Sequence, residues 1–154
     1  SDLSNKGYSE NWINQRLKSI EVRKELTDEW ERRGIKRGQE FATLTDIITQ
    51  GWSGMTTRQY KRYKGLKTES LRDNMTNLEL VLNMLAEATT TEISKERRPR
   101  TFAANRIVAA QGGRIAGNTR REIEAQTGKK IVSRLNAEQV LAAKEIEQNE
   151  EEKE

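Results

Sequence analysis

The chain has 154 residues, of which 33% are hydrophobic and 34% are charged, and it contains a single Pro. This composition favours one all-α domain with a thin core. The absence of Cys excludes disulfides and thiolate metal sites, and the absence of His removes the commonest general acid–base residue and transition-metal ligand.

The net charge of +4 is unevenly distributed along the chain. Residues 144–154 contain six Glu and two Lys, so residues 1–143 carry about +8. We expect residues 1–143 to form the helical domain and residues 144–154 to be a disordered acidic tail. A basic body indicates an anionic partner, and the alternative is a solvated surface with a solubilising tail.

The first predicted helix runs from about Ser9 to Arg33, with Ser9 as its N-cap and Gly34 after its end. Its apolar residues form two stripes that point in different directions, so the helix either bends near residues 19–21 or packs its two halves against different partners. We favour the second alternative, with the first half facing a neighbouring domain or a second subunit. The candidate interface residues are Trp12, Ile13, Leu17 and Ile20.

Residues 38–74 are predicted to form three further helices. The first spans about 38–50 and is followed by a turn at 51–54. The second is a short basic helix at 58–64, which Thr56 or Thr57 caps. The third is a short helix that Thr68 caps and that extends through Asn74.

Residues 76–93 are predicted to form the central buried helix, because apolar side chains occupy nearly all directions around its axis. Thr76 and Glu79 have the spacing of a capping box. The polar residues form only a narrow stripe of Glu79, Asn83, Glu87 and Thr90. These charges make a membrane span very unfavourable, so we expect a cytoplasmic protein without membrane contact.

Pro99 is expected to end the preceding helix, and Thr101 to cap a helix from Phe102 to about Gln126. Gly112, Gly113 and Gly117 lie inside this helix and indicate either a break or a close helix crossing. Residues 129–135 form a short segment that could be extended. Asn136 is expected to cap a last helix from about 137 to 147.

Two clusters of cations are candidate nucleic-acid contacts, because Lys and Arg neutralise phosphates. The first is interleaved with Tyr60 and Tyr63, which could stack on bases, and comprises Arg58, Lys61, Arg62, Lys64 and Lys67. The second comprises Arg97, Arg98, Arg100, Arg106, Arg114, Arg120 and Arg121. The alternatives are tyrosines in the core with lysines around them, and arginines paired with acidic residues such as Glu87 and Glu92.

No pattern typical of catalysis is present. The glycines at 112, 113 and 117 lack the Gly-Lys-Ser/Thr ending of a phosphate loop, and no Ser or Cys nucleophile has a His partner. We therefore expect a protein that is not an enzyme and that uses no metal or other cofactor.

Three blocks of sequence carry a family resemblance. They are GYSENWINQRLKSIEVRKELTDEW at 7–30, TTRQYKRYKGLKTESLRDNMTNLELVLNMLAEATTTEIS at 56–94 and AAQGGRIAGNTRREIEAQTGKKIVS at 109–133. They resemble the C-terminal region of bacterial DNA-damage-inducible protein D and its phage-antirepressor-like relatives. In that family an N-terminal BRO domain, a DNA-binding module, precedes this region. The resemblance implies that the chain is the C-terminal part of a longer protein.

The resemblance also implies a bacterial, SOS-associated role near the nucleoid, with DNA, repair proteins or regulatory proteins as partners. It implies no catalytic residues. Our first hypothesis is therefore a non-enzymatic domain that binds protein partners or helps to hold nucleic acid, with the arginines at 97, 98, 100, 114 and 121 as leading contacts. The second hypothesis is a homo-oligomerisation module that uses the stripe at 13, 17 and 20 and the small residues at 109–116.

Overall fold

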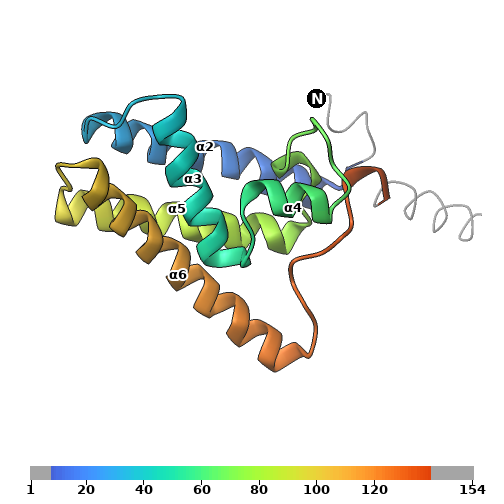
Figure 1. The fold of residues 1–154 in the computed structure, drawn as a ribbon. Helices are drawn as coiled ribbons and strands as arrows, with labels where there is room; N and C mark the ends of the chain where they lie inside the picture. The colour runs from blue at the N-terminus through green and yellow to red at the C-terminus, as the bar shows by residue number, and fades with distance from the viewer. Residues whose placement is uncertain (1–7, 140–154) are drawn as a thin grey trace, which may run out of the picture.

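The computed structural model describes residues 8–139. Within this range the chain is α-helical and has no β-strand, which confirms the predicted all-α fold. The elements are α2 (Glu10–Arg32), α3 (Gln39–Ser53), α4 (Thr57–Tyr63), the 3-10 helix η1 (Arg72–Asn74), α5 (Asn77–Arg97) and α6 (Phe102–Thr127) (Figure 1). Residues 137–139 are also helical, whereas the rest of the predicted last helix, the boundary at residue 143 and the acidic tail lie outside the described residues.

The predicted helix starts are confirmed by their capping bonds. The Ser9 hydroxyl accepts a hydrogen bond from the backbone N–H of Trp12 at 3.1 Å. Thr76 and Glu79 form the expected capping box, in which each side chain accepts the other residue's backbone N–H. The Thr101 hydroxyl caps α6. These bonds are made within three residues, so the local sequence sets them.

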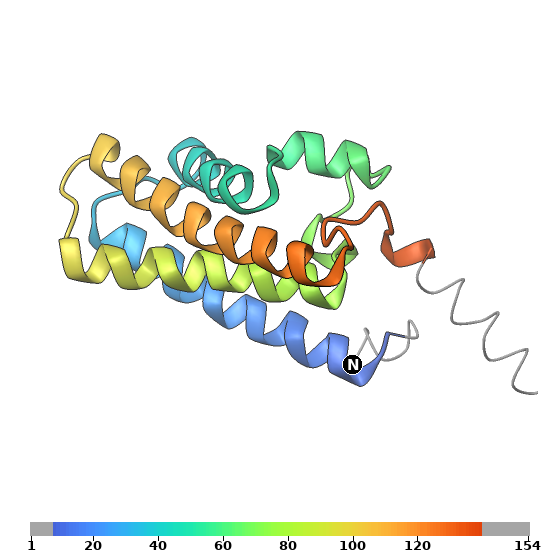
Figure 2. The same cartoon turned by 90° about the horizontal axis from the view of Figure 1, so that it is seen from below.

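Helix α5 lies at the centre, between α2 and α6 (Figure 2). Trp12, near the start of α2, donates through Nε1 to the carbonyl of Met75, just before α5 begins. Glu29, near the end of α2, accepts a bond from Ser94, near the end of α5. The two helices therefore run in the same direction, and α6 returns antiparallel to α5 after the turn at Pro99.

Helix α5 is central, as predicted, but its apolar side chains are not all buried. The narrow polar stripe of Glu79, Asn83 and Glu87 is buried, whereas Leu78 and Leu85 are exposed. The reason is that cations from other segments lie opposite the carboxylates. Arg23 and Arg72 bind Glu87, and Lys64 binds Glu79. A carboxylate that is paired and hydrogen-bonded can be buried, so this helix places polar groups in the core.

The glycines of α6 mark a close helix crossing, not a break. Helix α6 is continuous, and a Cβ on Gly113 would lie 2.8 Å from the carbonyl oxygen of Ile48. Gly51 lies opposite, where an added Cβ would lie 2.9 Å from the Gly113 backbone. Helix α3 extends through residues 51–53, which the sequence predicted as a turn. It ends before Gly54, whose φ is positive at 83°.

One short segment differs from its prediction, and a second was left open by the sequence. Thr68 does not cap a helix: the Glu69 carboxylate accepts the backbone N–H of Lys67, and regular structure begins only at η1. Residues 129–135 are not a strand. They run back from the end of α6 toward α4 and the start of α5 (Figure 1), where the Lys64 Nζ atom donates to the carbonyl of Leu135.

Candidate functional site

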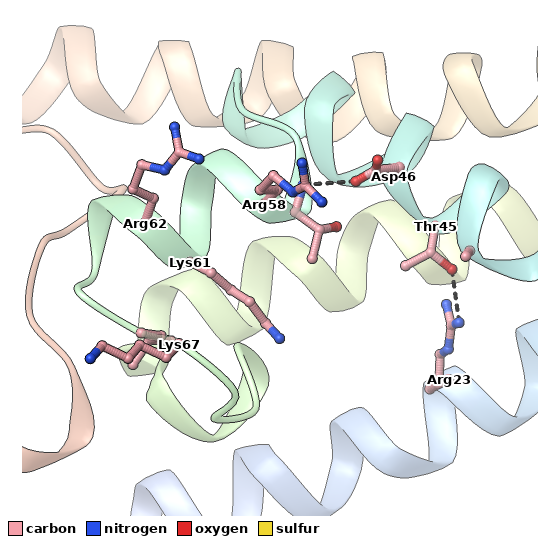
Figure 3. Close-up of a pocket in the computed structure, with 10 residues that line it drawn as sticks. Arg23, Thr45, Asp46, Arg58, Lys61, Arg62 and Lys67 are labelled. Carbon is pink, nitrogen blue, oxygen red and sulfur yellow. Dashed lines mark hydrogen bonds between the residues drawn. The ribbon is translucent and has the colours of Figure 1, made fainter.

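A pocket of about 670 Å³ opens between α2, α3 and α4, and we call it the basic groove (Figure 3). Five of the side chains that line it are cationic and one is a carboxylate. The lining residues are Arg23, Ala42, Thr45, Asp46, Thr57, Arg58, Lys61, Arg62, Leu66 and Lys67. None of them is aromatic, so this pocket offers charge and hydrogen bonds, not stacking.

Local structure fixes the position of α4 beside α3. Gly54 ends α3 in the left-handed conformation, and Thr56 caps α4 in a capping box with Gln59. The backbone N–H of Thr57 donates to the Asp46 carboxylate on α3 at 2.7 Å. This bond uses one oxygen of the only carboxylate in the lining and turns α4 so that Arg58, Lys61 and Arg62 border the groove.

Four cations of the groove have no ion-pair partner in the part of the chain that the structure describes. Within residues 8–139, no carboxylate oxygen lies within 4.0 Å of the charged nitrogens of Arg58, Lys61, Arg62 or Lys67. The positive charge of the groove is therefore not cancelled by neighbouring side chains, and it favours an anion in the pocket.

The fifth cation, Arg23, is held rigidly. Its guanidinium donates to Oε2 of Glu87 and to the Thr45 hydroxyl, both at 2.8 Å. Glu87 also accepts two bonds from Arg72, at 2.8 and 3.0 Å. Burial raises the pKa of Glu87, but Arg72 and Arg23 outweigh burial and hold that pKa below its ordinary value. The carboxylate therefore remains charged and anchors both guanidiniums.

The structure brings together most of the first predicted cluster, except Lys64. Lys64 and Glu79 are both fully buried and form an ion pair at 2.8 Å, so Lys64 is part of the interior and not of the basic surface. Tyr60 is also buried and donates to Glu79, which removes it from base stacking. Burial and the Glu79 charge raise the pKa of Tyr60, so its phenol stays protonated. Tyr63 lies half-buried beneath the Arg134 guanidinium.

The second predicted cluster lies elsewhere and does not form one site. Arg97, Arg98 and Arg100 are exposed around the turn between α5 and α6, and Arg106, Arg114 and Arg121 are exposed along α6. Arg120 is instead largely buried and donates to the carbonyl of Trp52 and to Glu124, so it fastens α6 to α3. The expected alternative partner, Glu87, is occupied by Arg23 and Arg72.

The four candidate interface residues separate into two pairs. Trp12 and Ile13 are buried in the core, and the Trp12 bond to Met75 spans 2.8 Å. These two side chains therefore pack inside this chain and do not form an exposed interface. Leu17 and Ile20 remain 53% and 51% exposed on α2.

Sequence reasoning missed Arg23, Arg72, Thr45 and Asp46 as site residues. A usable signal was present in α5, because Glu79, Asn83 and Glu87 recur every four residues on an otherwise apolar helix. Such a stripe indicates buried carboxylates that need cations from elsewhere in the chain. The sequence does not say which cations supply them.

No protein-family model matches the chain, and no curated protein sequence matches it significantly. Among residues 8–139, no helix is long and apolar enough to cross a lipid bilayer. In the same range, no three acidic side chains come together as ligands for a metal ion.

Proposed function

We propose that this chain is a non-enzymatic binding domain that holds the phosphate backbone of nucleic acid in the basic groove. The observation that carries the proposal is that Arg58, Lys61, Arg62 and Lys67 border one open pocket with no ion-pair partner among residues 8–139. Phosphate contacts of this kind supply affinity and little sequence information. The resemblance of the three sequence blocks adds the expectation of a DNA-damage-response context with protein partners.

The groove is a better candidate than the outer face of α6. Its cations come from three segments and converge on one concave surface of about 670 Å³, whereas Arg106, Arg114 and Arg121 follow one helix. A concave surface with one sign of charge concentrates the electric field, which raises the local concentration of an oppositely charged ligand.

Binding of fluorescent single- and double-stranded DNA, measured by anisotropy at low and moderate salt, tests this proposal. We expect Arg58→Gln, Arg62→Gln and Lys67→Gln together to weaken binding on the order of tenfold at low salt. The slope of log affinity against log salt should fall by about 2 to 3, because each lost phosphate contact contributes about 0.7 to 0.9.

The matched control removes the same charge from α6 through Arg106→Gln, Arg114→Gln and Arg121→Gln. These residues are exposed and make few contacts, so the variant should stay folded and keep most of the affinity. Equal losses in the two triple variants would mean that only net charge matters, and an unchanged salt slope in the groove variant would overturn the proposal.

A second candidate function is supported by the exposed pair on α2. Leu17 and Ile20 are each more than half exposed and lie three residues apart, on the same side of the helix. They could contact a second copy of the chain, as in the oligomerisation hypothesis.

A further inference from the structure

The basic groove continues inward into a second pocket of about 230 Å³. The two pockets share Thr45, Thr57 and Lys61, so these residues stand at the junction between them. The other residues of the inner pocket are Thr49, Ser70, Leu71, Arg72, Met75 and Asn83. Leu71, Met75 and Asn83 are buried and Ser70 is exposed, so the inner pocket reaches from the core to the surface.

The junction has more positive than negative charge. Nη1 of Arg23 and Nη2 of Arg72 both bond the same oxygen, Oε2 of Glu87, at 2.8 and 3.0 Å. One carboxylate thus faces two guanidiniums, and Lys61 adds a third cation without an ion-pair partner in the described chain. Asp46, the only carboxylate in the two linings, lines the outer pocket and accepts the backbone N–H of the junction residue Thr57.

Because one carboxylate faces two guanidiniums, the pKa values of Arg23 and Arg72 shift in opposite directions. Burial lowers the pKa of Arg23, and the Arg72 charge lowers it further against the attraction of Glu87. For Arg72, burial also lowers the pKa, but its two bonds to Glu87 more than compensate and raise it. Of the two arginines, Arg23, with one bond to Glu87, would therefore gain more from an additional anion.

We propose that the junction of the two pockets is a subsite for a phosphomonoester group. The Lys61 ammonium and the Thr57 hydroxyl, which has no hydrogen-bond partner among residues 8–139, would hold its oxygens, with Arg23 and Arg72 on either side. Figure 3 shows the Lys61 side chain extending from α4 toward the side where Arg23 rises from α2.

A monoester fits this subsite better than the internal phosphates of a strand. Near neutral pH a phosphomonoester carries nearly two negative charges, whereas each phosphodiester carries one. A terminal phosphate is attached to the strand on one side only and needs less room than an internal one, and the inner pocket is the smaller of the two, at about 230 Å³ against about 670 Å³. This inference rests on the proposed function for one source of the group, the phosphorylated end of a nucleic-acid strand; a free mononucleotide is the other.

The first experiment tests the subsite without nucleic acid. Thermal unfolding of the full chain is followed with inorganic phosphate against chloride at equal ionic strength and pH 7.5. At tenfold excess over its Kd, phosphate should raise the Tm of the wild-type chain by about 3 °C more than it raises that of Lys61→Gln. Arg114→Gln, which removes an exposed cation from α6 outside both pockets, should behave as wild type, and Lys61→Arg should keep most of the effect.

Phosphate also stabilises proteins in general through exclusion from their surface, and that contribution is common to all variants. The test is therefore the difference between the wild-type chain and Lys61→Gln in how far phosphate raises the Tm. Lys61 forms no ion pair in the described chain and is only half-buried, so its Gln variant should fold. Equal phosphate responses in the wild-type chain and Lys61→Gln would overturn the subsite.

The second experiment identifies the source of the monoester. A strand with a terminal phosphate should bind about tenfold more tightly than the same strand with terminal hydroxyls, and Lys61→Gln should remove this ratio while Arg62→Gln weakens both strands equally. Equal binding of both strands, with the phosphate effect on Tm intact, assigns the subsite to a free mononucleotide. If the wild-type chain binds neither strand but phosphate still raises its Tm, the proposed function is refuted and the subsite remains supported.

Discussion

At the scale of single residues, Glu87 connects the core to the basic groove. It is 1% exposed and accepts bonds from Arg23, Arg72 and Asn83, which come from three different segments. Burying a charge is costly unless it is paired, so removing one member of such a group leaves the others unpaired in the interior. Glu87 therefore stabilises the fold and also positions Arg23 at the groove.

We expect Glu87→Gln to lower the free energy of unfolding by about 3 to 5 kcal/mol, because Arg23 and Arg72 would lose their shared counter-charge. Urea denaturation measures the change. The exposed pair Lys24–Asp28 provides the control, since Asp28→Asn should cost less than about 1 kcal/mol. A loss below about 1 kcal/mol in the Glu87 variant would show that the buried network tolerates an uncompensated pair of arginines.

The pH dependence of unfolding gives a second readout of the same variant. The pKa of Glu87 is lower in the folded chain than in the unfolded chain, where a Glu titrates near about 4.3. Its contribution is therefore complete above the unfolded pKa and disappears as the pH falls through the folded pKa. The wild-type chain should lose stability below about pH 4.3 more steeply than Glu87→Gln does.

At the scale of elements, the contact between α3 and α6 depends on residues without side chains. Gly51 of α3 meets Gly113 and Gly117 of α6, and at Gly113 the nearest atoms to an added Cβ are backbone atoms of Ile48 and Gly51. Each glycine inside a helix costs roughly 1 kcal/mol against Ala. The close packing of the two backbones offsets that cost and aligns α3 so that Thr45 and Asp46 border the groove.

Gly113→Ala should lower the free energy of unfolding by about 1 to 3 kcal/mol, although Ala favours helices, because backbone atoms cannot move aside as a side chain can. Chemical denaturation of this variant is compared with that of Asn118→Ala, an exposed position on the same helix that should change by about 0.5 kcal/mol or less. A stabilised Gly113→Ala variant would mean that helix propensity outweighs the crossing.

At the scale of the whole molecule, most groove cations lie on other segments than the exposed apolar pair of α2. The groove cations lie on α2, α4 and the segment after α4, whereas Leu17 and Ile20 are exposed elsewhere on α2. Arg23 lies three residues after Ile20 on α2, whereas the other groove cations come from α4 and the segment after it, so the variants that test anion binding and self-association change different residues.

If α2 forms a contact between copies, light scattering should show a molar mass that rises with concentration. The double variant Leu17→Gln and Ile20→Gln should abolish the rise, because a polar side chain in an apolar interface loses its buried area. Ile107→Gln, which changes an exposed apolar residue on α6, is the control. A strict monomer at all concentrations would remove the oligomerisation hypothesis.

The sequence by itself determined most helix boundaries. Ser9, Thr56, Thr76 and Thr101 cap the helices as expected, and Gly34 follows α2 with a positive φ. These features depend on bonds between residues at most four apart, so a local pattern is sufficient to predict them. The first basic cluster was predictable for the same reason, since Arg58, Lys61 and Arg62 are neighbours on one short helix.

Only the tertiary structure decided which face of α5 is buried, whether α6 is continuous, and which cations line the groove. The sequence pattern showed Glu87 only as part of a narrow polar stripe, whereas Arg23 and Arg72, 64 and 15 residues away in the chain, pair with it in the core. The same pattern grouped Lys64 with the surface cations, although Lys64 forms a buried ion pair with Glu79. A charge can be buried only when its partner is present, and chain packing, not sequence spacing, brings those partners together.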